Sequence, residues 1–401
     1  MPYVYSQKDG LIHASKLNPL KVLHLISTLD IGGAEQNLFR LLTSMNRGVF
    51  ENRSICMTRP GIIGLRLKQA GLEVLSLNMK KGQPDIRSVL RLWLLSIVMR
   101  PDIVQCWMYH ANLLGLTLMK PAKTLWNIRC SDMDLSRYGS VYRFTVTAGA
   151  RFSHLPAAVI VNSYNGKDVH TGLGYHPKEW IVIPNGFNTE QYKPDPEARH
   201  SIRAELNIPA QAPAIGLVCR FDPMKDHASF ITAARSFLRV NKDTHFILAG
   251  RGVSRDNSPF MELLADFPQK DHLHILGERT DAERIFASLD IASSTSAWGE
   301  GLPNVVGEAM ATATPCVVTD AGDSRILVGE TGITVPRKDP QALCSAWKSL
   351  LDAGADQRKF LGEQARKRII DHYSLNTMTR SYEHLYQKLL KLAPGQSVPG
   401  Q

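Results

Sequence analysis

Short apolar runs alternate with stretches of helical periodicity along most of the chain. The first run covers residues 21–27, and a glycine-containing loop leads from it to a helical stretch at residues 34–44. Because strands that alternate with helices assemble into parallel sheets, this pattern predicts an α/β protein. Further strands of this first series are expected at residues 52–57, 73–77, 103–106, 123–128, 157–161 and 180–183.

A second series of the same kind begins with the apolar run at residues 214–219. The stretch between the two series, residues 184–200, is rich in Pro, Asn and Gly and is typical of a linker, with a boundary near residues 192–196. The pattern predicts two doubly wound sheets that face each other across a cleft, with ligands near the carboxyl ends of the strands. The other strands of this series are expected at residues 244–249, 272–276, 291–293 and 315–319.

Two helical stretches stand out beside this alternation. The amphipathic stretch at residues 85–99, rich in Leu and Arg, is predicted to pack on the core, and contact of its outward arginines with a membrane is the alternative. A second amphipathic stretch lies near the end of the chain. The predicted order is an extension at residues 1–20, a first domain at 21–195, a second at 196–374, a helix at 375–392 and a tail at 393–401.

The composition fits two globular domains. A chain of 401 residues is too long for one ordinary core, and contents of 44% hydrophobic and 21% charged residues are typical of a soluble protein. No apolar run approaches the roughly 20 residues that span a bilayer, and the N-terminus lacks the apolar core of a secretory signal. The cysteines form no C-x-x-C pair, so we expect buried free thiols in a reducing cytoplasm. They are Cys56, Cys106, Cys130, Cys219, Cys316 and Cys344.

The chain carries a formal net charge of +10. Such an excess suits anionic substrates, an anionic membrane surface or nucleic acid. No helix-turn-helix, zinc-finger or RNA-recognition pattern is present, which argues against nucleic acid. We therefore expect a cytoplasmic protein with anionic substrates and peripheral contact with an anionic membrane face. Solubility alone is the other explanation for the charge.

The densest chemistry lies in residues 296–320, SAWGEGLPNVVGEAMATATPCVVTD. Glycines beside Glu300 allow a ligand to approach the main chain, and Pro303 suits the first position of a helix. Backbone N–H groups at a helix start favour a bound phosphate. Glu308 falls in the second turn of that helix. Carboxylates that flank a phosphate site suit neutral hydroxyls, so the ligand is expected to be a phosphate with sugars on both sides.

This stretch resembles the motif block of retaining glycosyltransferases with the GT-B fold, family 4, also known as glycosyl transferases group 1. The resemblance implies two Rossmann-like domains around a central cleft and a nucleotide-sugar donor. It also implies that the final helix, at residues 375–392, crosses back onto the first domain.

Arg220 and Lys225 follow the apolar run GLVC, at the carboxyl end of a predicted strand. A planar guanidinium and an ammonium at this spacing form a candidate diphosphate clamp, although two solvated loop cations would look the same. In the family this pair stabilises the departing diphosphate. If these cations hold the diphosphate, Glu308 is left for the nucleotide ribose and Glu300 for the hydroxyls of the donor sugar.

The other candidate residues come from several loops. Gly32 and Gly33 resemble the family's GGAE loop over the cleft, and His110 matches a family histidine that hydrogen-bonds the donor sugar. Arg129 is a candidate acceptor or phosphate contact. Asn185, in an Asn-Gly pair, is assigned to chain reversal. The predicted substrate-binding set is completed by Gly250, Gly301, Leu302, Asn304 and Val305.

Together these residues predict a retaining, hexosyltransferase-type glycosyltransferase of polysaccharide or glycoconjugate synthesis. A UDP-sugar is the expected donor, with GDP-mannose next, and a glycan or lipid-linked glycan is the expected acceptor. No D-x-D motif follows a suitable strand, so neither a metal nor a cofactor is expected. Two alternatives stay open: a sugar-nucleotide epimerase of similar form, and a non-catalytic module that binds a sugar nucleotide.

Overall fold

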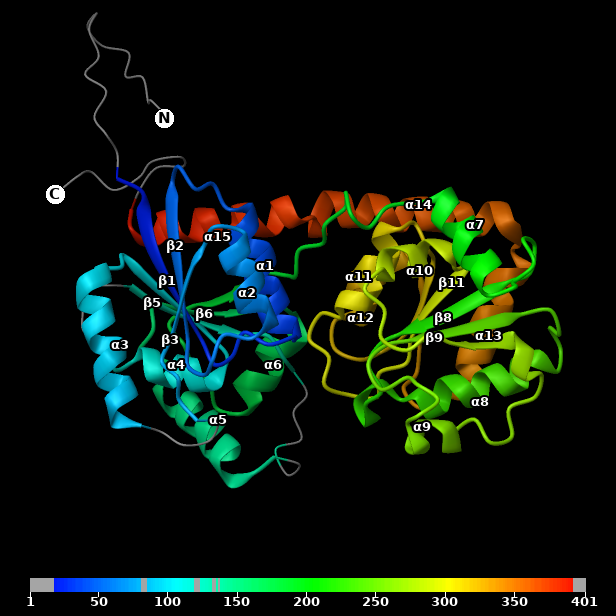
Figure 1. Ribbon diagram of the computed structural model, residues 1–401, viewed down its shortest axis with the longest axis horizontal. Helices are drawn as coiled ribbons and strands as arrows, with labels where there is room; N and C mark the ends of the chain where they lie inside the picture. The colour runs from blue at the N-terminus through cyan, green and yellow to red at the C-terminus, as the bar shows by residue number, and fades with distance from the viewer. Residues whose placement is uncertain (1–17, 81–84, 119–122, 132–134, 136–137, 392–401) are drawn as a thin grey trace, which may run out of the picture.

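The computed structural model describes residues 18–80, 85–118, 123–131, 135 and 138–391, which form two α/β domains side by side (Figure 1). The predicted extension and tail lie largely outside the described residues. Each domain is built on one parallel sheet, and helices cover both faces of the sheet. The predicted architecture of two doubly wound α/β domains is therefore confirmed.

The first domain contains a seven-stranded sheet with the order β3-β2-β1-β4-β5-β6-β7. Its strands are β1 (Leu20–Ile26), β2 (Phe50–Cys56), β3 (Glu73–Ser76), β4 (Ile103–Trp107), β5 (Lys123–Ile128), β6 (Ala158–Val161) and β7 (Trp180–Val182). Its helices are α1 (Gly33–Ser44), α2 (Ile62–Gln69), α3 (Ile86–Met99), α4 (Tyr109–Gly115), α5 (Ser140–Phe152) and α6 (Tyr164–Gly172).

The second domain contains a six-stranded sheet with the order β10-β9-β8-β11-β12-β13. Its strands are β8 (Ala214–Val218), β9 (His245–Ala249), β10 (Leu273–Ile275), β11 (Ile291–Ser294), β12 (Cys316–Thr319) and β13 (Ile333–Val335). Its helices are α7 (Pro196–Glu205), α8 (His227–Leu238), α9 (Ser258–Glu262), α10 (Ala282–Ser288), α11 (Asn304–Ala311), α12 (Ser324–Val328) and α13 (Pro340–Asp352), with the short η2 (Pro223–Lys225), η3 (Lys270–His272) and η4 (Gly329–Thr331).

Both sheets reverse their strand order at one point. In the first sheet β1 pairs with β2 on one side and with β4 on the other, so Leu23 lies between Arg53 and Val104. In the second sheet β8 is flanked by β9 and β11 in the same way. Loops that leave such a strand pair diverge to opposite faces, and the crevice between them is where ligands of open α/β sheets bind.

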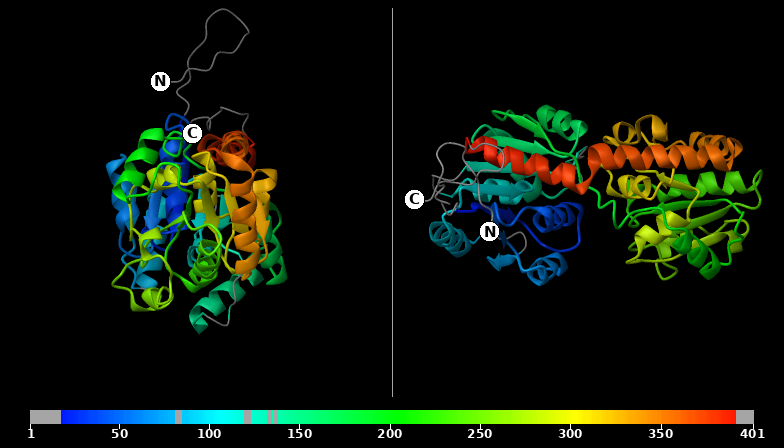
Figure 2. Two further views of the ribbon diagram at one scale, coloured as in Figure 1. Left: turned by 90° about the vertical axis from the view of Figure 1, so that its right-hand side faces the viewer. Right: turned by 90° about the horizontal axis from the view of Figure 1, so that it is seen from above.

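The last two helices connect the domains. Helix α14 (Gly354–Tyr373) packs on α11 and α13, and α15 (Leu375–Leu389) packs on α1, so the two helices run end to end along both domains (Figure 2). Buried Tyr382 and Tyr386 of α15 belong to the core of the first domain. At the junction Phe187 pairs with Ser374: its N–H donates to the Tyr373 carbonyl at 2.9 Å and its carbonyl accepts from Leu375 at 2.8 Å.

The structure corrects the sequence analysis at two points. The three-residue strand β13 is not among the predicted strands. Pro303 is not the first helical residue but the N-cap of α11, because its backbone is extended, with ψ 115°, and the helix begins at Asn304. All six cysteines lie in the described residues outside any disulfide, and the expected burial holds for four of them, whereas Cys130 and Cys344 are partly exposed. No helix in the described part of the chain is long and apolar enough to cross a bilayer.

Candidate active site

A cavity of about 630 Å³ lies where the carboxyl ends of the two sheets meet. Loops that follow β1, β4, β8 and β11 line it, so it occupies the switch point of both sheets. The structure brings most of the predicted site residues together here: Gly32, Gly33, Arg129, Arg220, Lys225, Gly250, Glu300, Gly301, Leu302, Asn304 and Val305. His110 and Glu308 are not among the described residues that line the cavity.

Lys225 and Glu300 form an ion pair in the cavity wall. The Lys225 Nζ donates to Oε1 of Glu300, and the Ser296 hydroxyl donates to the same oxygen at 2.6 Å. Burial of Glu300 opposes its ionisation, but the ammonium and the hydroxyl outweigh burial and lower the pKa of the carboxyl. Glu300 is thus a carboxylate, and its Oε1 already has two donors.

Arg220 is the more accessible of the two predicted cations. Its side chain is 45% exposed and its Nε donates to Asp222 at 3.1 Å. Asp222 also accepts from the Met224 N–H at 2.9 Å, which begins the short η2 helix that brings Lys225 to the cavity. The next residue, Asp226, has a left-handed backbone with φ 48° and caps α8. This tight turn lets two cations five residues apart line one cavity.

The amino end of α11 also points its backbone at the cavity. The first N–H groups of a helix have no partner within the helix, and the N-cap Pro303 provides no side-chain hydrogen bond to them. Leu302, Asn304 and Val305 of this end line the cavity. Gly301 is required by the close approach of the domains, because a Cβ there would overlap the Asn162 side chain. The result is a positive helix end beside two cations.

Gly250 closes the floor of the site. It has φ 144°, a conformation that side chains rarely adopt, and a Cβ there would overlap the Cys219 carbonyl. Its N–H donates to the Gly277 carbonyl at 2.7 Å. The backbones of the loops after β8 and β9 therefore lie against each other, which leaves room for a ligand above them.

Glu308 lies behind the cavity and contacts the other domain. Its Oε1 accepts from the Arg40 guanidinium of α1 at 2.6 Å, and Arg40 also donates to the Gly186 carbonyl at 3.3 Å. Burial raises the pKa of Glu308, and Arg40 only partly offsets this effect. The predicted ribose contact stays a prediction, because in this structure the carboxylate has Arg40 as its partner.

His110 lies in the first turn of α4, where its ring packs at 5.9 Å from the Tyr142 ring of α5. Burial lowers its pKa, so the imidazole is neutral near pH 7. The residue of this loop that lines the cavity is Met108, whose backbone has φ 68°. The structure thus places His110 beside the cavity wall rather than in it, and its predicted contact with the donor sugar stays a prediction.

Arg129 lines the cavity and also forms hydrogen bonds with the segment that connects the two domains. Its guanidinium donates to Tyr382 Oη at 3.1 Å and to Asn185 Oδ1 at 2.7 Å. The Asn185 amide in turn donates to Asn304 Oδ1 at 2.9 Å and to the Leu302 carbonyl at 3.0 Å. Asn185 therefore connects the hinge to the amino end of α11, a role beyond the chain reversal that its Asn-Gly pair predicts.

Several residues of the site are missed by the sequence analysis. Arg40 gives no signal beyond a charge on a helix. The Ser131 hydroxyl donates to the Glu300 carbonyl, and Asp323 accepts from the N–H groups of Tyr164 and Asn165 at 2.7 and 2.9 Å. All of these contacts join the two domains, so they depend on an arrangement that local patterns do not encode.

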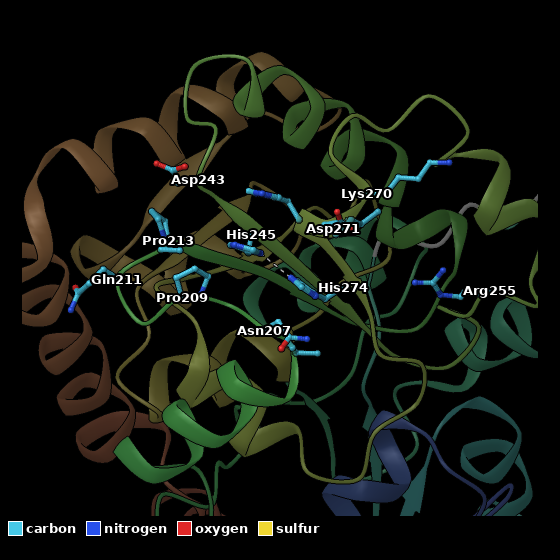
Figure 3. A pocket seen from close by; sticks show the side chains of 14 residues that line it. Asn207, Pro209, Gln211, Pro213, Asp243, His245, Arg255, Lys270, Asp271 and His274 are labelled. Atoms are coloured by element: carbon cyan, nitrogen blue, oxygen red, sulfur yellow. Dashed lines mark hydrogen bonds between the residues drawn. The ribbon is translucent and has the colours of Figure 1, made fainter.

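A second cavity, of about 880 Å³, lies at the other end of the strands of the second sheet, by the amino ends of β8, β9 and β10 (Figure 3). Three histidines meet there. The His245 and His272 rings stack at 4.3 Å, and Nδ1 of His245 is 3.0 Å from Nε2 of His274. Burial first, then neighbouring imidazoles, lower the pKa of His245 and His274 to about 4. These rings are therefore neutral near pH 7.

Comparisons with known proteins agree with this geometry. The family described as glycosyl transferases group 1 matches residues 212–353. An MMP α-(1→4)-mannosyltransferase of Mycolicibacterium hassiacum is 27% identical over 242 residues, 59% of this chain and 55% of that protein. A D-inositol 3-phosphate glycosyltransferase of Corynebacterium urealyticum is 29% identical over 233 residues, 55% of this chain and 54% of that protein. The chain spans about half the length of the curated relatives it matches.

Two solved structures share the fold over nearly the whole chain. Anabaena HepE in complex with UDP has a TM-score of 0.78 and 20% identity and covers 93% of this chain and 100% of its own. A glycosyltransferase from Rickettsia africae has a TM-score of 0.79 and 18% identity, with 94% and 100% covered. These likenesses show the GT-B fold of two Rossmann-like domains. Residues 212–353 of this chain resemble the glycosyl transferases group 1.

Proposed function

We propose that this chain transfers a sugar from a nucleotide diphosphate sugar to a glycan or lipid-linked glycan, with retention of the anomeric configuration. The observation that carries the proposal is the convergence of Arg220, Lys225 and the uncapped amino end of α11 in one cavity. A diphosphate needs such a set of fixed positive groups, and its charge increases as the glycosidic bond breaks.

The donor fits the cavity in one orientation. The diphosphate lies between Arg220 and the amino end of α11, and the sugar lies toward Glu300. Lys225 and Ser296 both donate to Oε1 of Glu300, so we assign Oε2 to a hydroxyl of the donor sugar. In this orientation Lys225 contacts the carboxylate and the diphosphate together, and it fixes the distance between sugar and leaving group.

The retaining mechanism follows from where the charges lie. The carboxylates that line the cavity are Glu35, Glu278 and Glu300, and Glu300 is held by Lys225 and Ser296. We assign none of them as a covalent nucleophile. Instead the acceptor oxygen bonds to the anomeric carbon on the face that the diphosphate leaves. The leaving phosphate oxygen takes the proton of the acceptor hydroxyl, so the diphosphate departs protonated.

A UDP-sugar is the proposed donor and a lipid-linked glycan at the cytoplasmic membrane face is the proposed acceptor. HepE structures contain UDP and UDP-glucose. A relative from Escherichia coli acts on a GlcNAc-diphosphoundecaprenol, and one from Rhizobium meliloti is a lipopolysaccharide core mannosyltransferase, with 24% and 25% identity. These names support a lipid-linked or polymeric acceptor, and the mannosyltransferases keep a mannose donor as the second choice.

The first test is a screen of nucleotide sugars by thermal shift, because a ligand that binds the folded state raises the melting temperature. A UDP-sugar that raises it, followed by transfer to an acceptor, supports the proposal. The product's anomeric configuration is then read from its NMR coupling constant. An inverted product would contradict the retaining mechanism, and no shift with any nucleotide sugar would contradict the donor assignment.

Two controls separate the alternative functions. An epimerase consumes a nucleotide sugar in the absence of an acceptor, whereas a transferase needs both substrates, so an acceptor-free incubation distinguishes them. A non-catalytic module would keep donor binding yet show no transfer with any acceptor, and its binding would be its only activity.

A further inference from the structure

The outward face of α3 carries an apolar stripe that no part of the described chain covers. Ile86, Leu90, Leu94, Ile97 and Val98 are each between 48% and 79% exposed. Their spacing of four, four, three and one places them on one side of a helix. Single exposed apolar residues are ordinary on protein surfaces, whereas five on one helix face form a patch that marks an interaction site.

This stripe lies on the side of α3 opposite to the one that packs on the core. The opposite side of α3 already packs on the first sheet through Leu92 and Met99, which belong to the buried cluster on that face. The sequence predicts that this helix faces the core, and its inward side does. The outward side is a second apolar surface, and no residue that the structure describes packs over it.

The same side of the domain carries several basic side chains, and the exposed Asp85 at the N-cap of α3 lies at one end of the stripe. Exposed Arg87 and Arg91 flank the stripe, and α3 contains no Asp or Glu. Helices α4 and α5 pack on the same sheet face and also contain no acidic residue, while α5 adds exposed Arg143 and Arg151. Arginine stems lie along apolar surfaces while their charged ends reach water or phosphate.

We propose that the outward face of α3 docks on an anionic lipid bilayer. A helix that lies in the bilayer interface buries its apolar side chains among the acyl chains and places its cations at the headgroups. Helix α3 lies at the end of the molecule away from the second domain (Figure 1), so a flat surface reaches it without meeting that domain. A bilayer therefore provides acyl chains for the apolar stripe and anionic headgroups for the arginines.

The basic side of the first domain also extends from the α3 end toward the cavity, which lies between the two domains. Tyr138 lines the cavity, and α5 begins two residues later, so the basic side of the domain continues to the cavity mouth. An acceptor held in the bilayer would then approach from the side of the first domain. Docking itself follows from α3 and does not depend on sugar transfer.

The test is flotation of the full chain with lipid vesicles, without nucleotide sugar. We expect the protein to float with vesicles that contain phosphatidylglycerol, to float weakly with phosphatidylcholine alone, and to detach as salt rises. Replacing Leu90→Gln and Leu94→Gln together should lower the partition coefficient by about a hundredfold, since burial of each leucine is worth roughly tenfold. Replacing Arg87→Gln and Arg91→Gln should lower it by roughly tenfold on anionic vesicles only.

A matched control is available on the other domain. Val240 and Phe360 are 68% and 53% exposed, and replacing both with Gln should leave flotation unchanged. All the altered side chains are exposed, and unchanged melting would show that each variant folds. The proposal is overturned if the wild-type chain stays in the buffer, or if the control variant weakens flotation as much as the α3 variant. It is also overturned if sedimentation shows a dimer that the leucine variant dissociates, because the stripe would then join two copies.

Discussion

The two walls of the cavity have different chemistry. The wall from the first domain offers mostly backbone and neutral side chains, such as Gly32, Gly33 and Met108, beside the charged Glu35 and Arg129. The wall from the second domain offers Arg220 and the Lys225–Glu300 pair, together with Arg251, Glu278 and Arg279. The family match at residues 212–353 lies wholly in the second domain. The charged wall is thus also the one that sequence comparison finds.

The difference indicates which kinds of ligand constrain the residues of a binding site. A diphosphate needs cations and N–H groups at set positions. The residues of the charged wall therefore form short motifs that can be recognised in the sequence. A neutral acceptor can be held by many combinations of backbone and uncharged side chains, so the other wall leaves no comparable motif.

The largest effect is expected from Lys225→Ala. Loss of a cation that stabilises the leaving group should lower kcat by about 10²–10³-fold. Kinetics with saturating donor measure this loss. The matched control is Lys348→Ala, whose partner Asp352 lies on the surface of α13, and it should leave kcat unchanged. Because Lys225→Ala also leaves Glu300 buried beside one fewer partner, melting must show that the variant is folded. Wild-type kcat in a folded Lys225→Ala variant would remove the charged wall from the mechanism.

Substitutions of Glu300 and Glu308 should change different kinetic constants. Glu300→Gln should lower kcat by about tenfold to a hundredfold, because a charged hydrogen bond at the donor sugar is lost. Glu308→Gln should mainly raise the donor KM, as expected for a group that binds the ground state and the transition state equally. Initial rates over a range of donor concentrations measure both. An unchanged kcat in Glu300→Gln would reverse this division of roles.

The contact between the domains should matter for stability. Arg40→Leu leaves the buried Glu308 without its cation, and we expect the free energy of unfolding to fall by about 2 kcal/mol. Calorimetry measures the loss. The double variant Arg40→Leu with Glu308→Leu should recover part of it, since no unpaired charge is buried. If the double variant lost as much stability as the two single changes added together, the pair would not be coupled as the 2.6 Å contact indicates.

The smallest effect concerns pH and the histidines of the second domain. Burial first lowers the pKa of His227, His245 and His274 to about 4, against about 6.5 in an unfolded chain. The unfolded state binds protons more tightly, so this stability is complete above about pH 6.5 and is lost as pH falls toward 4. In the first domain, burial lowers the pKa of His24 to about 4 as well.

We therefore expect the melting transition of the second domain to fall by several degrees between about pH 7 and about pH 5, and to fall more than that of the first domain. Calorimetry at the two pH values measures this. Replacing His245→Gln and His274→Gln should remove part of the slope (Figure 3). An equal slope in both domains would mean that these buried histidines do not set the pH response.

The sequence predicts the sheets well because each strand is an apolar run of its own. Strand β12 at Cys316–Thr319 is found, while the three-residue β13 is not. The sequence also brings Lys225 and Glu300 to one site, since both follow strand ends at the same edge. It cannot pair Arg40 with Glu308, because that contact depends on how two separate domains meet. The roles of the site residues stay predictions.

The junction of Phe187 with Ser374 has a mechanical consequence. The chain passes between the domains twice, and the two passages are hydrogen-bonded to each other at this point. Because the two passages are joined at this point, we expect them to act as one hinge about which the domains rotate. The width of the cavity would then change with the angle of rotation at this hinge. A donor held on the charged wall would meet the opposite wall along one path, and the geometry of encounter would be the same in every turnover.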